Sequence, residues 1–294
     1  MRNRKGILLA GGSGTRLHPV TKIVSKQILP LYDKPMIYYS MSILMLAGIK
    51  DILIISTPRD IIFFKNLFGN GKNLGINLSY EIQEKPKGIA QALIIADKFV
   101  GKSPMALILG DNFFYGSNLE EILITINKKI MSTIFAYEVK DPTRYGIISC
   151  DKNQIPCKIS EKPKKPKSNF AVTGLYFFEN EAIKVAKSLK PSKRGELEIT
   201  DVNKFFLKQK KLNVQYLSRG FAWLDTGTFE SFFEASQLIR TIENRQGIKI
   251  GCIEEIALKK GWINNSDFKL IIKNLSKSTY GDYLKKLNLK NENC

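Results

Sequence analysis

The residues best suited to chemistry begin at the end of the first apolar run, where residues 9–17 read LAGGSGTRL. Glycines at the carboxyl end of a strand let backbone N–H groups approach an anionic ligand, and open α/β sheets bind ligands just outside such strand ends. The segment lacks the Gly-Lys-Ser/Thr of the Walker loop, and Leu17 stands where the dinucleotide fingerprint needs a third glycine. The segment therefore predicts a phosphate-binding loop of another type. The alternative is a tight turn from strand to loop that binds no ligand.

Two aspartates offer carboxylates that could hold a cation beside this loop. Asp111 follows the apolar run 105–109 and Gly110, so a strand would deliver it at its tip, where phosphates and Mg²⁺ commonly meet. Because parallel strands end at one edge of a sheet, the glycine loop and Asp111 would open onto one crevice. A plain Gly-Asp turn is the alternative. Asp225, in the sequence WLDTGT, could bind the same cation or cap the helix that follows.

Histidine and cysteine usage excludes several other chemistries. The chain has one histidine, His18, and four cysteines without a Cys-x-x-Cys pair. A multi-histidine metal site, a zinc ribbon and a thioredoxin-type motif are therefore excluded, and the scattered cysteines are typical of reduced cytoplasmic thiols. Catalysis would rest on carboxylates, arginines, lysines and backbone amides. Lys26, Lys34 and Lys162 are the lysines nearest to the glycine loop or to strand ends.

Composition and charge indicate a globular chain. Of its 294 residues 44% are hydrophobic and 25% charged, and no apolar run approaches the roughly 20 residues of a membrane-spanning helix. The N-terminal apolar segment is too short for a signal peptide, so we expect no membrane insertion. The net charge of +19 comes from 37 lysines and nine arginines. Specific nucleic-acid surfaces favour arginine, so we interpret the lysines mainly as solvated surface, with a polyanionic ligand or partner as the alternative.

The elements that must position these residues follow from hydrophobic periodicity. The first half of the chain predicts strands at 5–10, 51–56, 78–82, 105–109 and 133–139, alternating with helices at 36–47, 61–68, 89–100 and 119–129. Such alternation implies right-handed crossovers between parallel strands. We therefore predict an α/β fold with a Rossmann-like, mostly parallel sheet and helices on both faces.

The pattern changes after residue 142. It predicts a hairpin at 145–162, strands at 170–178 and 212–217, helices at 181–189, 199–210 and 229–244, and further helices to the end. We divide the chain into an α/β core, residues 1–246 with halves at about 1–140 and 141–246, and a helical appendage, residues 247–294. We predict that the appendage, which carries the apolar residues Ile253, Ile256, Leu258 and Trp262, forms part of an oligomer interface. The alternative is that its helices simply close the core.

Taken together, these segments resemble the signature of the sugar-1-phosphate nucleotidyltransferases, in order along nearly the whole chain. The first half carries it in residues 9–17 with Pro19 and Thr21, SKQILP at 25–30, YDKPMI at 32–37, Gln83 with Pro86 and Gly88, and LGDN at 109–112. The second half carries it in RYG at 144–146, EKP at 161–163, VTGLY at 172–176, RGELEITD at 194–201 and WLDTG at 223–227.

The resemblance implies that dTTP and α-D-glucose 1-phosphate give dTDP-glucose and pyrophosphate in an Mg²⁺-dependent reaction. This is the usual first step toward dTDP-L-rhamnose and related bacterial surface-polysaccharide sugars. The resemblance also implies inserted sugar-binding strands within residues 141–246, a cytoplasmic homotetramer with a second nucleotide-sugar site near a subunit interface, and no nucleic-acid partner. The alternatives are the same reaction with UTP or another sugar 1-phosphate, or a non-catalytic binder of nucleotide sugars or nucleic acid. Arg16, Lys26 and Asp111 argue against the non-catalytic alternative.

The resemblance assigns roles by motif. Asp111 and Asp225 would bind Mg²⁺, and the implied catalytic residues are Arg16 and Lys26 on the triphosphate, Lys162 on the sugar phosphate, and Asp111. The implied nucleotide-binding set is Leu9, Gly11, Gly12, Ser13, Gly14, Thr15, Arg16, Lys26, Gln83, Pro86, Gly88 and Asp111. The implied set for the sugar phosphate is Tyr145, Gly146, Glu161, Lys162, Val172 and Tyr176.

Gln83 would read the base. A side-chain amide offers one acceptor and one donor, which match the N3–H and O4 of thymine or uracil but do not distinguish the two bases. Cytosine presents the opposite pattern and could pair only if the amide flipped. If the backbone near Gly88 fixes the amide, cytosine would leave buried polar groups unpaired.

Overall fold

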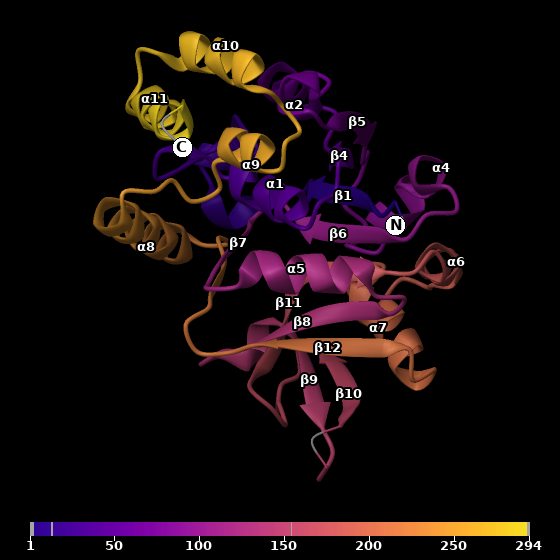
Figure 1. Cartoon of the computed structure of the whole chain (residues 1–294). Coiled ribbons are helices and arrows are strands. Elements are labelled where there is room, and N and C mark those ends of the chain that lie inside the picture. The colour runs from indigo at the N-terminus through magenta and orange to yellow at the C-terminus, as the bar shows by residue number, and fades with distance from the viewer. Residues whose placement is uncertain (1–2, 13, 154, 293–294) are drawn as a thin grey trace.

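The central sheet gathers the predicted strand ends at one edge. A computed structural model describes residues 3–12, 14–153 and 155–292 (Figure 1), so Ser13 of the glycine loop lies outside the described residues. The described chain forms a nine-stranded sheet, within which four strands run in the order β6-β1-β4-β5. They are β1 (Lys5–Ala10), β4 (Asp51–Ser56), β5 (Asn77–Ile82) and β6 (Met105–Leu109). All three pairings among them are parallel, so their carboxyl ends share one edge.

Strand β11 (Phe170–Phe178) joins the second half of the chain to this sheet by pairing antiparallel with β6. The other strands of this half are β8 (Ser132–Glu138), β9 (Gly146–Cys150), β10 (Pro156–Glu161) and β12 (Leu212–Leu217). Strand β11 pairs antiparallel with β8 along its length and with β9 at Ala171. Strands β9 and β10 are the predicted hairpin, and β12 runs parallel to β8. The register of β11 shifts between Val172 and Tyr176, where its neighbour changes from β9 to β6.

Helices cover both faces of the sheet, which confirms the predicted fold class (Figure 1). The helices are α1 (Ile37–Leu46), α2 (Ile61–Phe68), α3 (Gln91–Ile95), α4 (Asp97–Val100), α5 (Leu119–Lys128), α6 (Glu181–Ser188) and α7 (Ile199–Lys208). Leu8 and Ala10 of β1 face one core with α1, α2 and α5, whereas Ile7 and Leu9 face a second core with α3, α4, α6 and α7. Burial on both faces explains why the central strands are continuous apolar runs in the sequence.

Several short elements were not predicted. Strands β7 (Asn112–Tyr115) and β13 (Ala222–Asp225) form a two-stranded antiparallel sheet, and β2 (Pro30–Leu31) pairs with β3 (Lys34–Pro35). Single 3₁₀ turns occupy Thr15–Leu17, Val20–Lys22, Lys26–Ile28, Lys72–Leu74 and Pro142–Arg144. The β7–β13 pair decides the geometry of the site, because it brings residue 225 beside residue 112.

The C-terminal helices share the core of the N-terminal half. They are α8 (Phe229–Gln246), α9 (Ile253–Lys259), α10 (Asn265–Leu275) and α11 (Thr279–Glu292). The last residue of α8 is also the last residue that we assigned to the α/β core. Ile253 and Phe268 are buried in the same core as α1, and Ile256, Leu258 and Trp262 pack against it. These apolar residues of the appendage therefore pack on the core of the N-terminal half, and the predicted role of the appendage in an oligomer interface stays a prediction.

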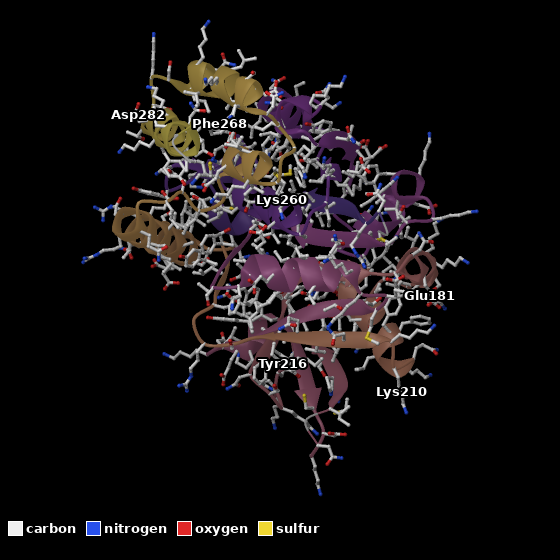
Figure 2. All side chains as sticks on the ribbon, viewed as in Figure 1. Glu181, Lys210, Tyr216, Lys260, Phe268 and Asp282 are labelled. Atoms are coloured by element: carbon white, nitrogen blue, oxygen red, sulfur yellow. The ribbon has the colours of Figure 1, made fainter. Side chains whose placement is uncertain are left out.

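The outer surface carries the excess lysines. Figure 2 shows side chains with nitrogen tips projecting around the whole visible outline, as expected for a positive charge spread over the molecule. Among the described helices, none combines the length and the apolar character that crossing a membrane requires.

A buried cluster of four charges attaches α8 to the N-terminal half. The Glu243 carboxylate accepts hydrogen bonds from the Lys34 ammonium at 3.2 Å, the Lys249 ammonium at 2.7 Å and the Ile250 backbone N–H at 2.9 Å. Both ammonium groups also pair with Asp33. Lys34, which the sequence placed near the glycine loop, is thus a structural residue whose side chain is only 3% exposed.

We predict that Glu243→Ala destabilises the fold by about 3 kcal/mol, because the Lys34 and Lys249 ammonium groups would be left to share a single carboxylate, that of Asp33. The free energy of unfolding, measured by chemical denaturation, checks this. Glu234→Ala, an exposed position on the same helix, is the matched control and should change stability by less than about 0.5 kcal/mol. Equal stability of the two variants would contradict the prediction.

Candidate functional site

The glycine loop leaves β1 in a conformation that requires glycine. Gly12 has a φ of 107° and Gly14 a φ of 58°, both in the left-handed region. The Thr21 hydroxyl donates a hydrogen bond to the Gly14 carbonyl at 2.7 Å, and a Cβ on Gly14 would lie 3.1 Å from that of Thr21. The chain then enters the 3₁₀ turn at 15–17 that carries Arg16. Backbone conformation and close packing therefore both demand the glycine at position 14.

Two adjoining cavities lie where β1 and β6 end, and both have Gly11, Gly12 and Arg16 in their walls. The larger, of about 290 Å³, is lined by Leu9, Gly11, Gly12, Arg16, Gln27, Gln83, Pro86, Gly88, Ile89, Leu109, Asp111 and Glu196. The smaller, of about 200 Å³, is lined by Gly11, Gly12, Gly14, Thr15, Arg16, Leu17, Lys26 and Gly227. The structure thus brings together the whole implied nucleotide-binding set apart from Ser13, which is not among the described residues. It adds Gln27 and Glu196, to which the sequence assigned no role.

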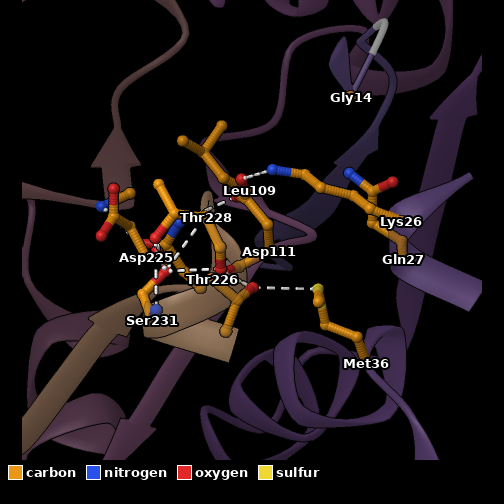
Figure 3. Close-up of polar contacts among 12 residues, drawn as sticks. Gly14, Lys26, Gln27, Met36, Leu109, Asp111, Asp225, Thr226, Thr228 and Ser231 are labelled. Atoms are coloured by element: carbon orange, nitrogen blue, oxygen red, sulfur yellow. Dashed lines mark hydrogen bonds and ion pairs between the residues drawn. The ribbon is translucent and has the colours of Figure 1, made fainter. Parts of the chain in front are cut away.

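Asp111 lies between β6 and β7 with a cationic side chain beside it. The Lys26 ammonium donates a hydrogen bond to its carboxylate (Figure 3), and the Asn112 side-chain amide donates one to the other carboxylate oxygen at 3.0 Å. Burial alone would raise the pKa of Asp111, but the charge and hydrogen bond of Lys26, aided by Asn112, outweigh it and lower the pKa. Asp111 is therefore ionised at neutral pH.

Asp225 reaches the same place from β13, which pairs with β7 and sets Asp225 opposite Asn112. Its carboxylate accepts hydrogen bonds from the Tyr145 hydroxyl at 2.9 Å and the Arg144 guanidinium at 3.4 Å. Burial raises the pKa of Asp225, and the charge of Asp111 adds to this rise against the hydrogen bond of Tyr145 and the charges of two arginines. The two carboxylates therefore repel each other, and Asp225 is the harder of them to ionise.

The cap of α8 does not use the Asp225 carboxylate. The Thr228 hydroxyl accepts a hydrogen bond from the Ser231 N–H at 3.2 Å, and the Ser231 hydroxyl accepts one from the Thr228 N–H at 3.1 Å. This reciprocal pair is a capping box (Figure 3). The alternative that Asp225 caps the following helix is therefore wrong.

The two carboxylates suit Mg²⁺. This ion prefers oxygen ligands, keeps several waters and is commonly held by one or two carboxylates together with substrate phosphates. Over the ranges that the structure describes, no group of three or more His, Cys, Asp and Glu could hold an ion alone, so phosphate and water would complete the coordination. A cation between Asp111 and Asp225 would also relieve the repulsion that raises the pKa of Asp225. The residues present therefore fit the ion.

Asn112 is a structural centre of the site that sequence reasoning missed. Its buried side-chain oxygen accepts hydrogen bonds from the Trp223 indole N–H at 2.7 Å and the Gly174 backbone N–H at 3.0 Å. Gly174 permits this approach, because a Cβ there would lie 2.6 Å from the Asn112 oxygen. One amide thus ties β11 and β13 to Asp111. The available signal was a polar residue directly after Asp111 and before an aromatic run.

Four residues of the implied sugar-phosphate set lie close together between β9, β10 and β11. Gly146 pairs with Glu161 in the β9–β10 register, and a Cβ on Gly146 would lie 3.4 Å from a Glu161 carboxylate oxygen and 4.0 Å from the Val172 Cβ. Burial, with the nearby charges of Glu161 and Asp111, raises the pKa of Tyr176, so its hydroxyl stays neutral. The sequence missed the residues that hold Glu161, which are Thr200, at 2.5 Å, and Arg194, at 3.3 Å.

The other two members of that set lie toward the carboxylates. The Tyr145 hydroxyl is bonded to Asp225, and the Tyr145 carbonyl accepts a hydrogen bond from the Lys162 N–H at 3.0 Å. Lys162 directly follows β10, is exposed and has a φ of 39°, a left-handed value that is unfavourable for a residue with a side chain. Such strain is typical of residues held in place for function.

The arrangement of backbone amides, Arg16, Lys26 and Asp111 around two cavities that share Gly11, Gly12 and Arg16 is suited to holding a polyphosphate. A family model of the nucleotidyl transferases matches residues 5–242. The chain therefore belongs to the nucleotidyl transferase family.

Relatives with assigned activities narrow the comparison. The chain is 53% identical over 281 residues to the glucose-1-phosphate thymidylyltransferase of Neisseria gonorrhoeae, covering 95% of this chain and 98% of that one. It is 52% identical over 285 residues to the enzyme of that name from Xanthomonas campestris pv. campestris, covering 97% of each.

Solved structures agree with the architecture. A crystal structure of a candidate glucose-1-phosphate thymidylyltransferase from Bacillus anthracis aligns with a TM-score of 0.74 at 40% identity, covering 81% of this chain and 95% of that one. A UDP-glucose pyrophosphorylase complexed with UDP-glucose aligns with a TM-score of 0.72 at 27% identity, covering 81% and 98%.

The raised pKa of Asp225 predicts a pH dependence that Tyr145 controls. If Asp225 must be ionised to hold a cation, pyrophosphate release falls as the pH drops through its pKa. Tyr145→Phe removes a hydrogen bond that favours the carboxylate, so the acid limb of the kcat/KM profile should move to higher pH. Tyr80→Phe, whose hydroxyl instead bonds the Gly69 carbonyl at 2.5 Å, is the control. An acid limb that stays in place in Tyr145→Phe would contradict the assignment.

Proposed function

We propose that the protein is a glucose-1-phosphate thymidylyltransferase that transfers a thymidylyl group from dTTP to α-D-glucose 1-phosphate, giving dTDP-glucose and pyrophosphate. The observation that carries the proposal is the convergence of the glycine loop, Arg16, Lys26 and Asp111 on the adjoining cavities, with Asp225 opposite Asn112 on the neighbouring strand β13. The two relatives above, more than half identical over almost the full length, bear this name.

The chemistry asks the protein for positioning and charge neutralisation. A phosphate oxygen of glucose 1-phosphate is already ionised near neutral pH, so no histidine base is needed. This oxygen forms a bond to the α-phosphorus of dTTP as the bond from that phosphorus to the β-phosphate oxygen breaks, and pyrophosphate leaves. Both reactants are polyanions, so bringing them together and balancing the charge at the α-phosphorus account for the catalysis.

The residues divide these tasks. In this proposal the loop amides and Arg16 hold the triphosphate, with Arg16 favouring the departing pyrophosphate. Lys26, which already touches Asp111, lies where it can bridge that carboxylate and the phosphates. Lys162, fixed in a strained backbone conformation beside Tyr145, would orient the phosphate of the sugar.

Asp111 and Asp225 would hold Mg²⁺. When bound, the ion would neutralise charge on the phosphates and help to align them. Without it, two neighbouring carboxylates would repel a triphosphate, which supports the ion as part of the proposal.

The second group of residues would bind the hexose. Gly146 leaves room beside Glu161, whose carboxylate Thr200 and Arg194 hold in place. Val172 provides an apolar contact, and the neutral Tyr176 hydroxyl can donate and accept hydrogen bonds. These features support an uncharged, hydroxyl-rich ligand.

The proposal extends to the setting of the enzyme. Following the family resemblance, we place it in the cytoplasm as a homotetramer that supplies dTDP-glucose for dTDP-L-rhamnose and related surface sugars. A cavity of about 650 Å³, lined by α1 and by residues within 114–124 and 248–259 and by no residue of the glycine loop, is the place we propose for the second nucleotide-sugar site.

A substrate panel tests the function directly. Pyrophosphate release is measured for dTTP, UTP, CTP and GTP, each with the 1-phosphates of glucose, galactose and glucosamine. We expect the highest kcat/KM for dTTP with glucose 1-phosphate, a lower value for UTP, and much lower values for CTP. A preference for another sugar 1-phosphate, or the absence of pyrophosphate release from every pair, would overturn the assignment.

We further predict that activity requires a divalent cation and the Asp111 carboxylate. Asp111→Asn removes the charge that faces Lys26 and should lower kcat/KM by about 10²- to 10³-fold, the usual effect of losing one electrostatic group at the reacting centre. Asp97→Asn, in an exposed ion pair with Lys187, is the control for loss of one negative charge and should remain active. Full activity in excess chelator, or of Asp111→Asn, would remove the metal assignment.

A further inference from the structure

Gln83 is held by a second glutamine that lies outside the cavity. The Gln83 Nε2 donates a hydrogen bond to Gln91 Oε1 at 2.9 Å, and the Lys87 backbone N–H donates to the same oxygen at 2.9 Å. Gln91 is the first residue of α3 and does not line the larger cavity, whereas Gln83 lines it and is only 3% exposed.

This pair of hydrogen bonds fixes which way each amide faces. A backbone N–H can only donate, so it selects the oxygen of the Gln91 amide and not the nitrogen. That oxygen in turn requires a donor from Gln83, which must present its nitrogen. The Gln83 oxygen therefore points elsewhere, and it lies against Gly11, where an added Cβ would be 2.4 Å away.

The orientation leaves a defined pattern for a ligand. The Gln83 oxygen can accept one hydrogen bond, and the second N–H of its nitrogen can donate one. This matches the N3–H and O4 of thymine and uracil, while cytosine has an acceptor at N3 and donors at its 4-amino group. A flipped Gln83 would suit cytosine, but its oxygen would then face the Gln91 oxygen.

We propose that Gln91 is a positioning residue that selects 4-oxo pyrimidines over 4-amino pyrimidines by locking the Gln83 amide. The inference rests on the proposed function, because it assumes that Gln83 meets the base. It also specifies the expectation drawn from the sequence that backbone near Gly88 fixes the amide: the backbone group is the N–H of the preceding residue, Lys87, and it acts through Gln91.

Two substitutions distinguish the effect of the Gln91 side-chain oxygen, which accepts hydrogen bonds, from the effect of the size of the side chain. Gln91→Glu keeps an oxygen that accepts from both Lys87 and Gln83, so Gln83 should stay locked. Gln91→Met has a similar length without that oxygen, so Gln83 becomes free to flip. Gln91→Ala serves as a second variant without an acceptor if Gln91→Met folds poorly.

The primary measurement is calorimetric binding of dTTP and dCTP without sugar phosphate, supported by the ratio of kcat/KM for the two nucleotides and by thermal unfolding. We expect the wild type and Gln91→Glu to favour dTTP strongly. Gln91→Met should narrow the preference by about 10- to 100-fold, with tighter dCTP binding and weaker dTTP binding. In a Gln83→Ala background, Gln91→Met should leave the ratio unchanged.

Each result bears on a different claim. Three results would overturn the role of Gln91. The first is an affinity ratio of dTTP to dCTP that stays unchanged in both Gln91→Met and Gln91→Ala. The others are an equal loss of affinity for the two nucleotides, and a loss of the preference for dTTP in Gln91→Glu. The proposed function fails separately, if the wild type releases no pyrophosphate from dTTP and glucose 1-phosphate.

Discussion

The buried amide of Asn112 is the interaction on which the geometry of the site depends. Its oxygen accepts hydrogen bonds from Trp223 of β13 and Gly174 of β11, and its nitrogen donates one to the Asp111 carboxylate. These three contacts join the end of the parallel sheet to the strands of the second half of the chain. In the proposed function, the residues that would bind the nucleotide and those that would bind the sugar must lie at a fixed separation. This amide connects the elements that carry both sets.

The same junction creates an electrostatic asymmetry. Asp111 has Lys26 beside it and a lowered pKa. The pKa of Asp225 is raised, because burial and the charge of Asp111 disfavour its ionised form. In the proposed function, such a pair would offer one permanent charge and a second that a bound cation would stabilise. Around it the protein places positive side chains and backbone amides, which suits a reaction between two polyanions and explains how a chain with a single histidine can perform it.

The sequence predicts most of the framework because burial on both faces leaves clear apolar runs. The bounds of β1, β4, β6, β11 and β12 agree with their expected ranges. The pair β7–β13 was missed, since four-residue strands that are far apart in the chain leave no periodic signal. The motif resemblance gave a role to 11 of the 17 residues that line the two cavities. It gave no role to Asn112, Thr200 or Gln91, because each acts through hydrogen bonds that only the folded chain reveals.

The packing of the C-terminal helices on α1 has a consequence for synthesis of the chain. The backbone at Gly251 lies so close to α1 that an added Cβ would be 2.9 Å from the Tyr39 ring, and Leu284 of α11 is buried in the same core. A ribosome must therefore have made the chain as far as Leu284 before the outer face of α1 can be fully covered. Until then the emerging N-terminal half exposes an apolar helix, and in that period it most needs protection from aggregation.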